Sequence, residues 1–587
     1  MTSAPSFPGP APAWCLWRNP ILRRFLRTRL RPRALGASLL IVLLIAGFIF
    51  AMARTSGNSQ REYQQREVEM AAAAGRPAPE WAQNGLSMES VERMYLIPLL
   101  ILQGFILFVV GTGQVAGGMT ADADEGTMDY MRLSPMTPLA KVLGYLFGLP
   151  VREWLMFAVT LPFTAWGLWK GAVPASNWVP VYAVVLTAAV LYHLTGLTAG
   201  TVLRNRRWAF LVSMGGVFLL YTLIPQLAKL GLVYFEYLTI MPVVTENMVG
   251  FIPLSAGAVL RTAQELQADV SFFGLDFPEA VFTIFSQLVL CLTFGVMLWR
   301  RWRKPESHLL GKGWASGLAV WIQIVLLGCA LPLISPGLLF MSRRFSMGMG
   351  RIYRNMGSWE PRLSEATAMI AIYGTVSLLS VMLLSLLIAP AKERQITGLR
   401  RAFRLSGRRI PLFSDEAPSL PFVIFMALAA AAGWTLFARG VIGSHWFPGQ
   451  ALPAWAPAAF GLVILTTSVC GALLYELRGA KAVFLAFIVV GVVPVLTGSV
   501  MAAAARDFSV ASVWITSASP FMAPANAVTT ALPDALGDHT PMQLAGPRAF
   551  IFWQGLMLIA ALWLWRKQRA EAKTRAPRAT SEPSTSR

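Results

Sequence analysis

The chain has little charge for its length. Charged residues make up only 13% of its 587 residues, whereas hydrophobic residues make up 55% and the mean hydropathy is +0.56. A soluble protein of this length needs about a quarter of its residues charged to cover its surface. The apolar residues come instead in blocks of roughly 18–25, each long enough to cross a bilayer as a helix. The composition therefore excludes a soluble globular protein and predicts an integral membrane protein.

Cysteine is scarce as well. Three of the four cysteines lie inside apolar blocks, no two form a C-x-x-C pair, and all are far apart: Cys15, Cys291, Cys329 and Cys470. This spacing excludes a disulfide framework and a zinc site, so the thiols are interpreted as small buried hydrophobes.

Motifs that define several enzyme classes are missing. No G-x-x-x-x-G-K-[ST] phosphate loop occurs, since Gly311-Lys312 lacks both the first glycine and the Ser or Thr. There is no H-E-x-x-H, no Asp-rich diphosphate motif and no Ser/His/Asp cluster, and His308, His445 and His539 lie on different loops. We therefore expect no ATPase site, no metal and no cofactor in this chain, and a membrane-embedded enzyme is the least favoured reading.

Acidic residues are few compared with basic ones, and the net charge is +21. The basic residues cluster in short segments beside apolar blocks, which is the positive-inside pattern and argues against nucleic-acid binding. These segments place both termini in the cytoplasm. The loop Met341–Ala366 disagrees with the pattern, because it carries several arginines and yet must lie outside.

Charge and hydropathy together predict an all-α polytopic membrane protein with about twelve transmembrane helices. The expected spans are Leu35–Ala53, Met94–Ala116, Trp154–Trp169, Trp178–Leu203, Trp208–Pro225, Glu279–Trp299, Trp314–Phe340, Thr367–Ile388, Leu420–Phe437, Trp455–Leu474, Ala482–Ala503 and Arg548–Trp565. The outside segments Gln226–Pro278 and Arg506–Pro547 are rich in Pro and Gly.

Two local matches indicate an internal duplication. GTMDYMRLS from Gly126 resembles GLRRAFRLS from Gly398, and LRNRRWAFL from Leu203 resembles LRGAKAVFL from Leu477, at nearly equal separations. Two parallel six-span repeats follow. The predicted divisions are an amphipathic helix (1–34), a first six-span half (35–304), a linker (305–313), a second six-span half (314–569) and a disordered cytoplasmic tail (570–587).

The loop ADADEGTMDYMRLSPMTPLAKVLG (Ala121–Gly144) is predicted to face the cytoplasm between the second and third spans. Three carboxylates precede a Gly-Thr pair, where they would stabilise the start of a short helix: Asp122, Asp124 and Glu125. Met128, Met131, Leu133 and Met136 would offer adaptable contact to a protein partner. Pro135 ends the helix and Lys141 opens the next segment. On this reading the carboxylates are solvated, and replacing them with alanine leaves folding largely intact.

This stretch resembles the coupling loop of the permease subunits of type-2 ATP-binding-cassette exporters. The matching positions are Asp122, Asp124, Gly126, Thr127, Leu133, Pro135 and Lys141, while Ala140-Lys141 replaces the family's Gly-Lys. The alternative to a coupling loop is an ordinary solvated loop in which the carboxylates only cap a helix.

A second resemblance lies before the first span. RNPILRRFLRTRLRPRA is similar to the family's interface helix at Asn19, Pro20, Arg23 and Arg24, although Phe25 stands where Glu is frequent. An apolar face opposite the arginines predicts a helix along the cytoplasmic interface: Trp14, Trp17, Ile21, Leu22, Phe25 and Leu26. The resemblance is good over Arg18–Lys304. In the second half AKERQITGLRRAFRLSGRRIPLF keeps the place but loses the acidic Gly-Thr pair; its candidate residues are Glu393, Gly398, Arg404 and Leu405.

The resemblance implies a permease in the bacterial cytoplasmic (inner) membrane, contacting lipid and two ATP-binding-cassette ATPase subunits that hold ATP and Mg. Export of an unidentified substrate is the expected direction. It also implies short helices that dip back into the membrane after the fifth and eleventh spans. The main rival is a twelve-span secondary transporter; such carriers need ionisable groups at mid-membrane, and His193 is the one mid-span candidate.

Overall fold

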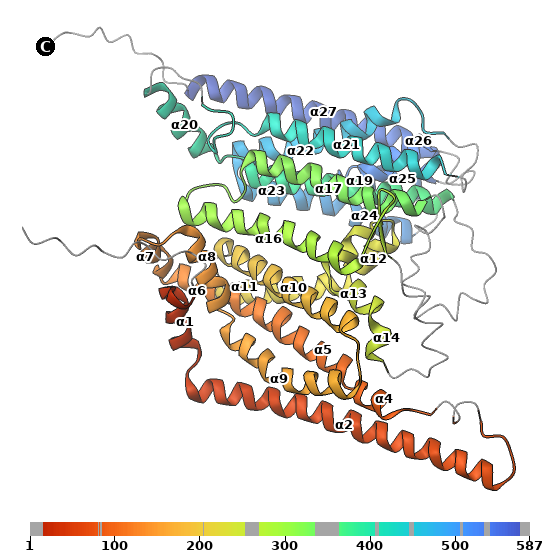
Figure 1. Cartoon of the computed structure of the whole chain (residues 1–587). Coiled ribbons are helices and arrows are strands. Elements are labelled where there is room, and N and C mark those ends of the chain that lie inside the picture. Colours follow the sequence, from red (N-terminus) through yellow and green to blue (C-terminus); the bar gives the residue numbers. More distant parts are fainter. Residues whose placement is uncertain are drawn as a thin grey trace, which may run out of the picture. The chain divides into compact units, whose positions relative to one another are not determined.

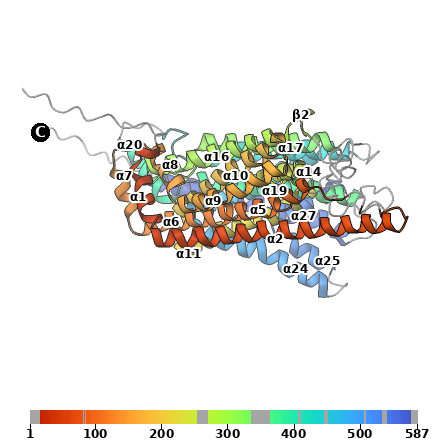
Figure 2. The same cartoon turned by 60° about the horizontal axis from the view of Figure 1, so that its bottom comes forward.

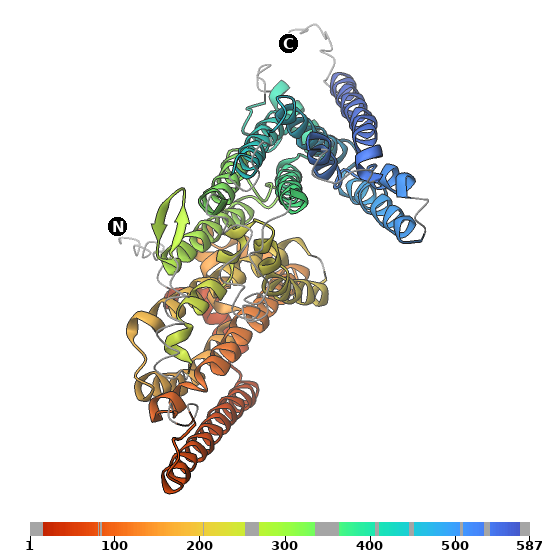
Figure 3. The same cartoon turned by 90° about the vertical axis from the view of Figure 1, so that its right-hand side faces the viewer.

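The structure is a computed structural model of the chain. It describes residues 16–79, 82, 85–203, 205–252, 269–334, 363–404, 410–444, 451–504, 509–532 and 541–575. Of the described residues, 83% are helical, and the two short strands among them form a hairpin, visible in Figure 3 as yellow-green arrows. The predicted all-α membrane protein is confirmed.

Within the described ranges, ten helices are long and apolar enough to cross a membrane, or eleven if the bent pair α8 (Pro138–Gly148) and α9 (Val151–Lys170) forms one span. Two places account for the difference from the twelve predicted spans. The third predicted span coincides with α9, which is bent by 52° against α8. The fifth coincides with α11 (Arg206–Thr222), whose 17 residues fall short of the roughly 20 that a bilayer needs.

The chain divides into two compact units, separated mainly at residues 305 and 306. The larger part of the first unit consists of η1 (Leu16–Arg18), α1 (Pro20–Arg29), α2 (Pro32–Ala73), α4 (Met88–Arg93), α5 (Leu96–Gly104), η2 (Phe105–Gly111), α6 (Thr112–Asp124), α7 (Thr127–Leu133), α8, α9, α10 (Ala175–Val202), α11, α13 (Met241–Glu246), α14 (Met248–Phe251) and α16 (Glu279–Arg303).

The second unit contains α17 (Lys312–Ile334), α19 (Leu363–Ile388), α20 (Lys392–Arg404), α21 (Leu420–Ile442), α22 (Ala456–Arg478), α23 (Ala480–Ala486), η5 (Phe487–Val492), α24 (Val493–Ala504), α25 (Ser509–Thr516), α26 (Ala523–Ala531) and α27 (Pro541–Arg575). The division passes through three short elements, α12 (Ile224–Lys229), η3 (Val233–Leu238) and β1 (Val270–Phe272), whereas β2 (Leu275–Phe277) belongs to the first unit.

Helix α10 lies at the centre of the first unit (Figure 1). It packs against α6 and α16, and α11 packs against α6. Two glycines of α10 allow this close approach: a Cβ at Gly196 would lie 2.8 Å from the Thr112 carbonyl oxygen, and one at Gly200 would lie 2.7 Å from that of Ala116. Small residues at helix contacts are what packing in a membrane requires, because van der Waals contact between backbones replaces the hydrophobic effect there.

Helix α2 is much longer than the span predicted at Leu35–Ala53. Its 42 residues extend for about 63 Å, roughly twice the thickness of the hydrocarbon core, and Figure 2 shows its far end projecting beyond the neighbouring helices. The polar second half packs through Gly57, where a Cβ would lie 2.7 Å from Met94 and 2.8 Å from Val91. The first span therefore continues as a polar helix outside the apolar layer.

The second unit is held together by an aromatic core. Trp434 of α21 stacks on Phe460 of α22 with ring centroids 3.9 Å apart, and its indole N–H donates to the Ile370 carbonyl of α19. Gly374 makes room for that indole, because a Cβ there would lie 2.3 Å from it.

Short helices follow the fifth and eleventh predicted spans, as expected: α12, η3, α13 and α14 in one case, α25 and α26 in the other. Their predicted return into the membrane remains a prediction, and so does the parallel repeat. Most of the arginine-rich loop Met341–Ala366 lies outside the described residues.

Candidate functional site: the α7 loop and its supports

The Asn-Pro pair begins α1 and fixes it to α8. Asn19 Oδ1 accepts hydrogen bonds from the backbone N–H groups of Ile21 (2.9 Å) and Leu22 (3.4 Å), and Pro20 occupies the first helical position, where no N–H is needed. The same side chain donates from Nδ2 to the Ala140 carbonyl at 2.6 Å. One asparagine therefore both caps α1 and joins it to a residue 121 positions away.

Helix α1 packs against a glycine face of α8. Ile21 and Phe25 are buried, and Cβ atoms at Gly144 and Gly148 would lie 2.9 Å from Ile21 and 2.6 Å from Phe25. The predicted apolar face is thus correct at its centre, but α8 covers that part of it. Trp17, which was assigned to the same face, is 70% exposed, and Trp14 lies outside the described residues.

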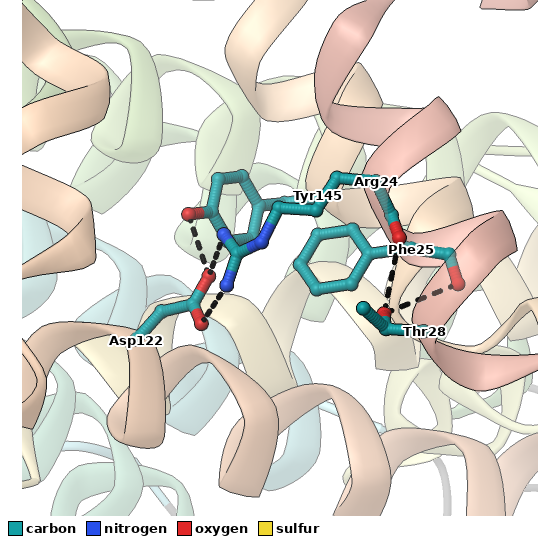
Figure 4. Close-up of polar contacts among 5 residues, drawn as sticks. All are labelled: Arg24, Phe25, Thr28, Asp122 and Tyr145. Atoms are coloured by element: carbon teal, nitrogen blue, oxygen red, sulfur yellow. Dashed lines mark hydrogen bonds and ion pairs between the residues drawn. The ribbon is translucent and has the colours of Figure 1, made fainter.

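An ion pair joins α1 to the end of α6 (Figure 4). The Arg24 guanidinium donates to both carboxylate oxygens of Asp122 at 2.9 and 3.0 Å, and the Tyr145 hydroxyl donates to the same carboxylate at 2.8 Å. Burial lowers the pKa of Arg24, but the hydrogen bond and charge of Asp122 outweigh this and leave that pKa raised. The carboxylate is only 6% exposed, so the cluster is a buried charge-assisted network.

This geometry corrects the prediction that the three carboxylates form a solvated helix start. Asp122 and Asp124 are the last turn of α6, and Glu125 follows it as the C-terminal cap. Negative charge at a helix C-terminus opposes the helix dipole, so Asp122 needs the compensation that Arg24 supplies. Asp124 and Glu125 are exposed, as expected of solvated groups.

Helix α7 is held at both ends and exposes its outer face. Gly126 takes φ = +70°, a left-handed turn that lets Thr127 begin α7 directly after α6. Met128 is buried, whereas Tyr130 and Leu133 are 74% and 84% exposed. The predicted short helix is therefore present, with one methionine anchoring it and two large apolar side chains facing outward.

Lys141 holds the other end of α7. It lies in the first turns of α8, is 4% exposed, and donates from Nζ to the carbonyl oxygens of Arg132 (3.1 Å) and Ser134 (3.2 Å). These are carbonyls that a helix end leaves without partners. The break between α7 and α8 contains Pro135, which is exposed, and the Trp302 ring lies 5.9 Å from the Lys141 ammonium.

The second-half loop has a different structure. Glu393, Gly398 and Arg404 all belong to the single helix α20, and Leu405 lies outside the described residues. A Cβ at Gly398 would lie 2.6 Å from the Glu416 side chain, and Arg401 pairs with Glu416 at 3.5 Å. The structure therefore offers no counterpart of the α6–Gly126–α7 turn among the described residues of this loop.

Sequence reasoning missed three side chains that support these loops. Tyr145 and Trp302 carry no motif, and Lys312 was considered only as part of a failed phosphate loop. Lys312 is 2% exposed and donates to the carbonyl oxygens of Ser414 (2.7 Å) and Ala417 (2.5 Å). Lys312 could have been identified as a lone lysine at the start of an apolar helix, the position that Lys141 also has.

Among the described residues, no group of three or more His, Cys, Asp or Glu side chains is placed to hold a metal ion. Comparison with protein-family models, with curated proteins and with solved structures finds no match.

Proposed function

We propose that the chain is the membrane-spanning permease of a type-2 ATP-binding-cassette exporter, and that α7 is where an ATPase subunit docks. The observation that carries the proposal is the presentation of Tyr130 and Leu133 on a helix whose two ends are fixed. Large exposed apolar and aromatic side chains on a rigid element are typical anchors of protein interfaces, because little conformational entropy is lost when they are buried.

The residues on either side of α7 connect it mechanically to the membrane-spanning helices. Helices α5, η2 and α6 follow one another within the long span Met88–Asp124, so only Glu125 and Gly126 separate α7 from a spanning helix. Lys141 joins it to α8, and the Arg24–Asp122 pair fixes α1 to the same corner. A displacement of α7 by a docked subunit would therefore move the spanning helices with it.

In this proposal the energy comes from separate subunits. ATP and Mg would be bound by two ATPase copies, and the permease would supply both membrane halves as about twelve spans, with α11 as a short one. The chain itself would not be an enzyme. Both termini would lie in the cytoplasm of a bacterial cell, with the chain in its inner membrane, and export remains the expected direction.

Secondary transport receives less support from the geometry. The mid-span candidate His193 is buried, and its Nε2 lies 3.0 Å from the Leu107 carbonyl in the π-helical segment η2. A histidine that joins two helices in this way has a structural task.

Crosslinking tests the proposal. Cysteine at Tyr130 or Leu133 should crosslink to an ATPase subunit co-expressed with the chain, whereas cysteine at Leu275, which is 64% exposed on β2, should not. Tyr130→Ala together with Leu133→Ala should reduce co-purified ATPase by at least about tenfold. Equal crosslinking at all three positions, or unchanged co-purification, would contradict docking at α7.

A further inference from the structure

Three buried polar side chains of the second unit converge on one small recess. Thr467 of α22, Ser517 after α25 and Asn526 of α26 are 6%, 3% and 1% exposed. Within the described part of the chain, the Thr467 and Ser517 hydroxyls and both amide atoms of Asn526 have no hydrogen-bond partner. All three side chains line the recess.

Unpaired groups of this kind are costly inside a membrane domain, where an unmade hydrogen bond costs about 1–3 kcal/mol. Other polar groups in the same wall are paired: Gln554 Nε2 donates to Thr466 Oγ1 at 2.6 Å, and the Trp553 indole donates to the Trp514 carbonyl at 2.9 Å. Among the residues that line the recess, the unpaired polar atoms belong to Thr467, Ser517 and Asn526, which indicates a ligand group there.

A larger apolar chamber adjoins the recess. Its volume is about 530 Å³, it lies among α19, α22, α23, η5 and α27, and it shares Thr467, Pro520 and Met557 with the recess. The side chains of Phe484, Phe487, Phe521 and Leu564 are among those that line it, and none of its lining residues is charged. Such a combination of apolar volume and a few convergent polar groups is typical of small-molecule sites.

One wall of the chamber is irregular. The segment η5 is π-helical, and the Gly491 carbonyl in it accepts a hydrogen bond from Ser519 Oγ at 2.6 Å. The Phe521 ring fits against Gly491, where a Cβ would lie 2.3 Å from it. Single π-turns occur frequently at functional sites, and this one shapes the chamber wall beside the recess.

The size and charge of the two spaces define the ligand. The recess has a volume of about 10 Å³, room for a single water-sized group, which excludes a phosphate head group. The absence of charged residues from both linings excludes an ionised carboxylate as well. A hydroxyl fits, because it can donate to Asn526 Oδ1 and accept from Asn526 Nδ2 or from a neighbouring hydroxyl.

We propose that the second unit binds an uncharged amphiphile, with its hydrocarbon body in the chamber and a single terminal hydroxyl in the recess of Thr467, Ser517 and Asn526. The assignment of this ligand to the transported substrate rests on the proposed permease function. Binding itself does not, and it is measurable without any ATPase.

The test uses the purified full chain in detergent and a photoactivatable hexadecanol, with photoactivatable hexadecanoic acid and hexadecane as matched probes. The alcohol should label peptides of α22 and α27 saturably, and it should bind at least about tenfold more tightly than either other probe. Asn526→Leu, which removes the polar atoms at similar size, should abolish the preference over hexadecane. Thr467→Val should reduce that preference severalfold, and Met557→Trp should fill the chamber and reduce labelling by all probes.

Asn526→Leu should fold at least as well as the native chain, since it removes an unpaired buried amide; if it fails to fold, Thr467→Val carries the test. Equal binding of alcohol and hexadecane, or an unchanged preference in the folded variants, would overturn the proposal and leave a lipid-facing groove with one bridging water. Loss of ATPase docking with alcohol binding intact would contradict the proposed function alone. Failed alcohol binding with intact docking would contradict only this site.

Discussion

Arg24 and Asp122 form a bidentate ion pair between helices that begin 92 positions apart, with nitrogen–oxygen distances of 2.9 and 3.0 Å. The pair fixes the amphipathic helix α1 to the end of α6, directly before the exposed helix α7.

The first prediction concerns this pair. Asp122→Asn should lower the free energy of unfolding by about 2 kcal/mol, because it leaves a partly buried guanidinium and the Tyr145 hydroxyl without their anionic partner. Asp124→Asn is the control, since that carboxylate is exposed and should have an effect within about 0.5 kcal/mol. Thermal unfolding in detergent measures both; equal effects would show that the pair contributes nothing.

The second prediction concerns the close approach of α1 and α8. Gly148→Ala should destabilise the chain by about 1–3 kcal/mol, because its Cβ would lie 2.6 Å from the Phe25 ring. Phe25→Leu should partly restore stability in the double variant. Gly216→Ala in α11, where a Cβ meets no atom within 4 Å, should be neutral or stabilising. If both glycine variants unfold alike, α1 does not depend on this contact.

The third prediction concerns Lys141. Lys141→Met should leave membrane insertion intact but loosen the end of α7, because two carbonyl oxygens lose their donor. Hydrogen exchange of residues 128–134 should become faster by about tenfold, and ATPase docking should weaken. Lys170→Met, on an exposed lysine at the end of α9, should change neither measurement. Unchanged exchange in Lys141→Met would show that the carbonyl contacts do not hold the helix.

The fourth prediction is a pH dependence of the second unit. Burial lowers the pKa of His308 from 6.5 to about 4, with smaller contributions from Asp415, Arg394 and Lys312, and its Nε2 lies 3.0 Å from the Asp415 carbonyl. The unfolded chain therefore binds this proton at higher pH than the folded chain. The resulting loss of stability begins as pH falls below about 6.5 and is complete near pH 4, on the order of 2–3 kcal/mol.

His308→Gln should lack this part of the pH dependence, while stability above pH 7 changes little between the two chains. Unfolding of both proteins from pH 7.5 to pH 4 provides the comparison. Parallel curves over that range would contradict the assignment.

The apolar blocks were sufficient to predict a polytopic helical protein, because a bilayer fixes helix length and composition locally. The interface helix and the short helix after Gly126 were also predictable from local patterns: an Asn-Pro cap with alternating arginines, and a Gly-Thr pair. The partners of these elements were not. Asp122 was expected to be solvated, because nothing near it in sequence indicates that Arg24 lies beside it.

The recess around Asn526 could not be predicted from the sequence either. Asparagine, serine and threonine in apolar segments are common, and only the folded arrangement shows which remain without partners. The mismatch at α11 has a local cause: its helix ends at Thr222, shortly before Pro225, so an apolar block that looked long enough forms a short helix.

The mass of the complex purified from its native membrane through a tag on this chain tests the central claim most directly. We predict one copy of the chain with two ATPase subunits, and loss of those subunits in the Tyr130→Ala, Leu133→Ala double variant. Two copies of the chain in each complex would show that its halves do not pair with each other. A chain that carries no ATPase, or that hydrolyses ATP alone, would contradict the proposed function.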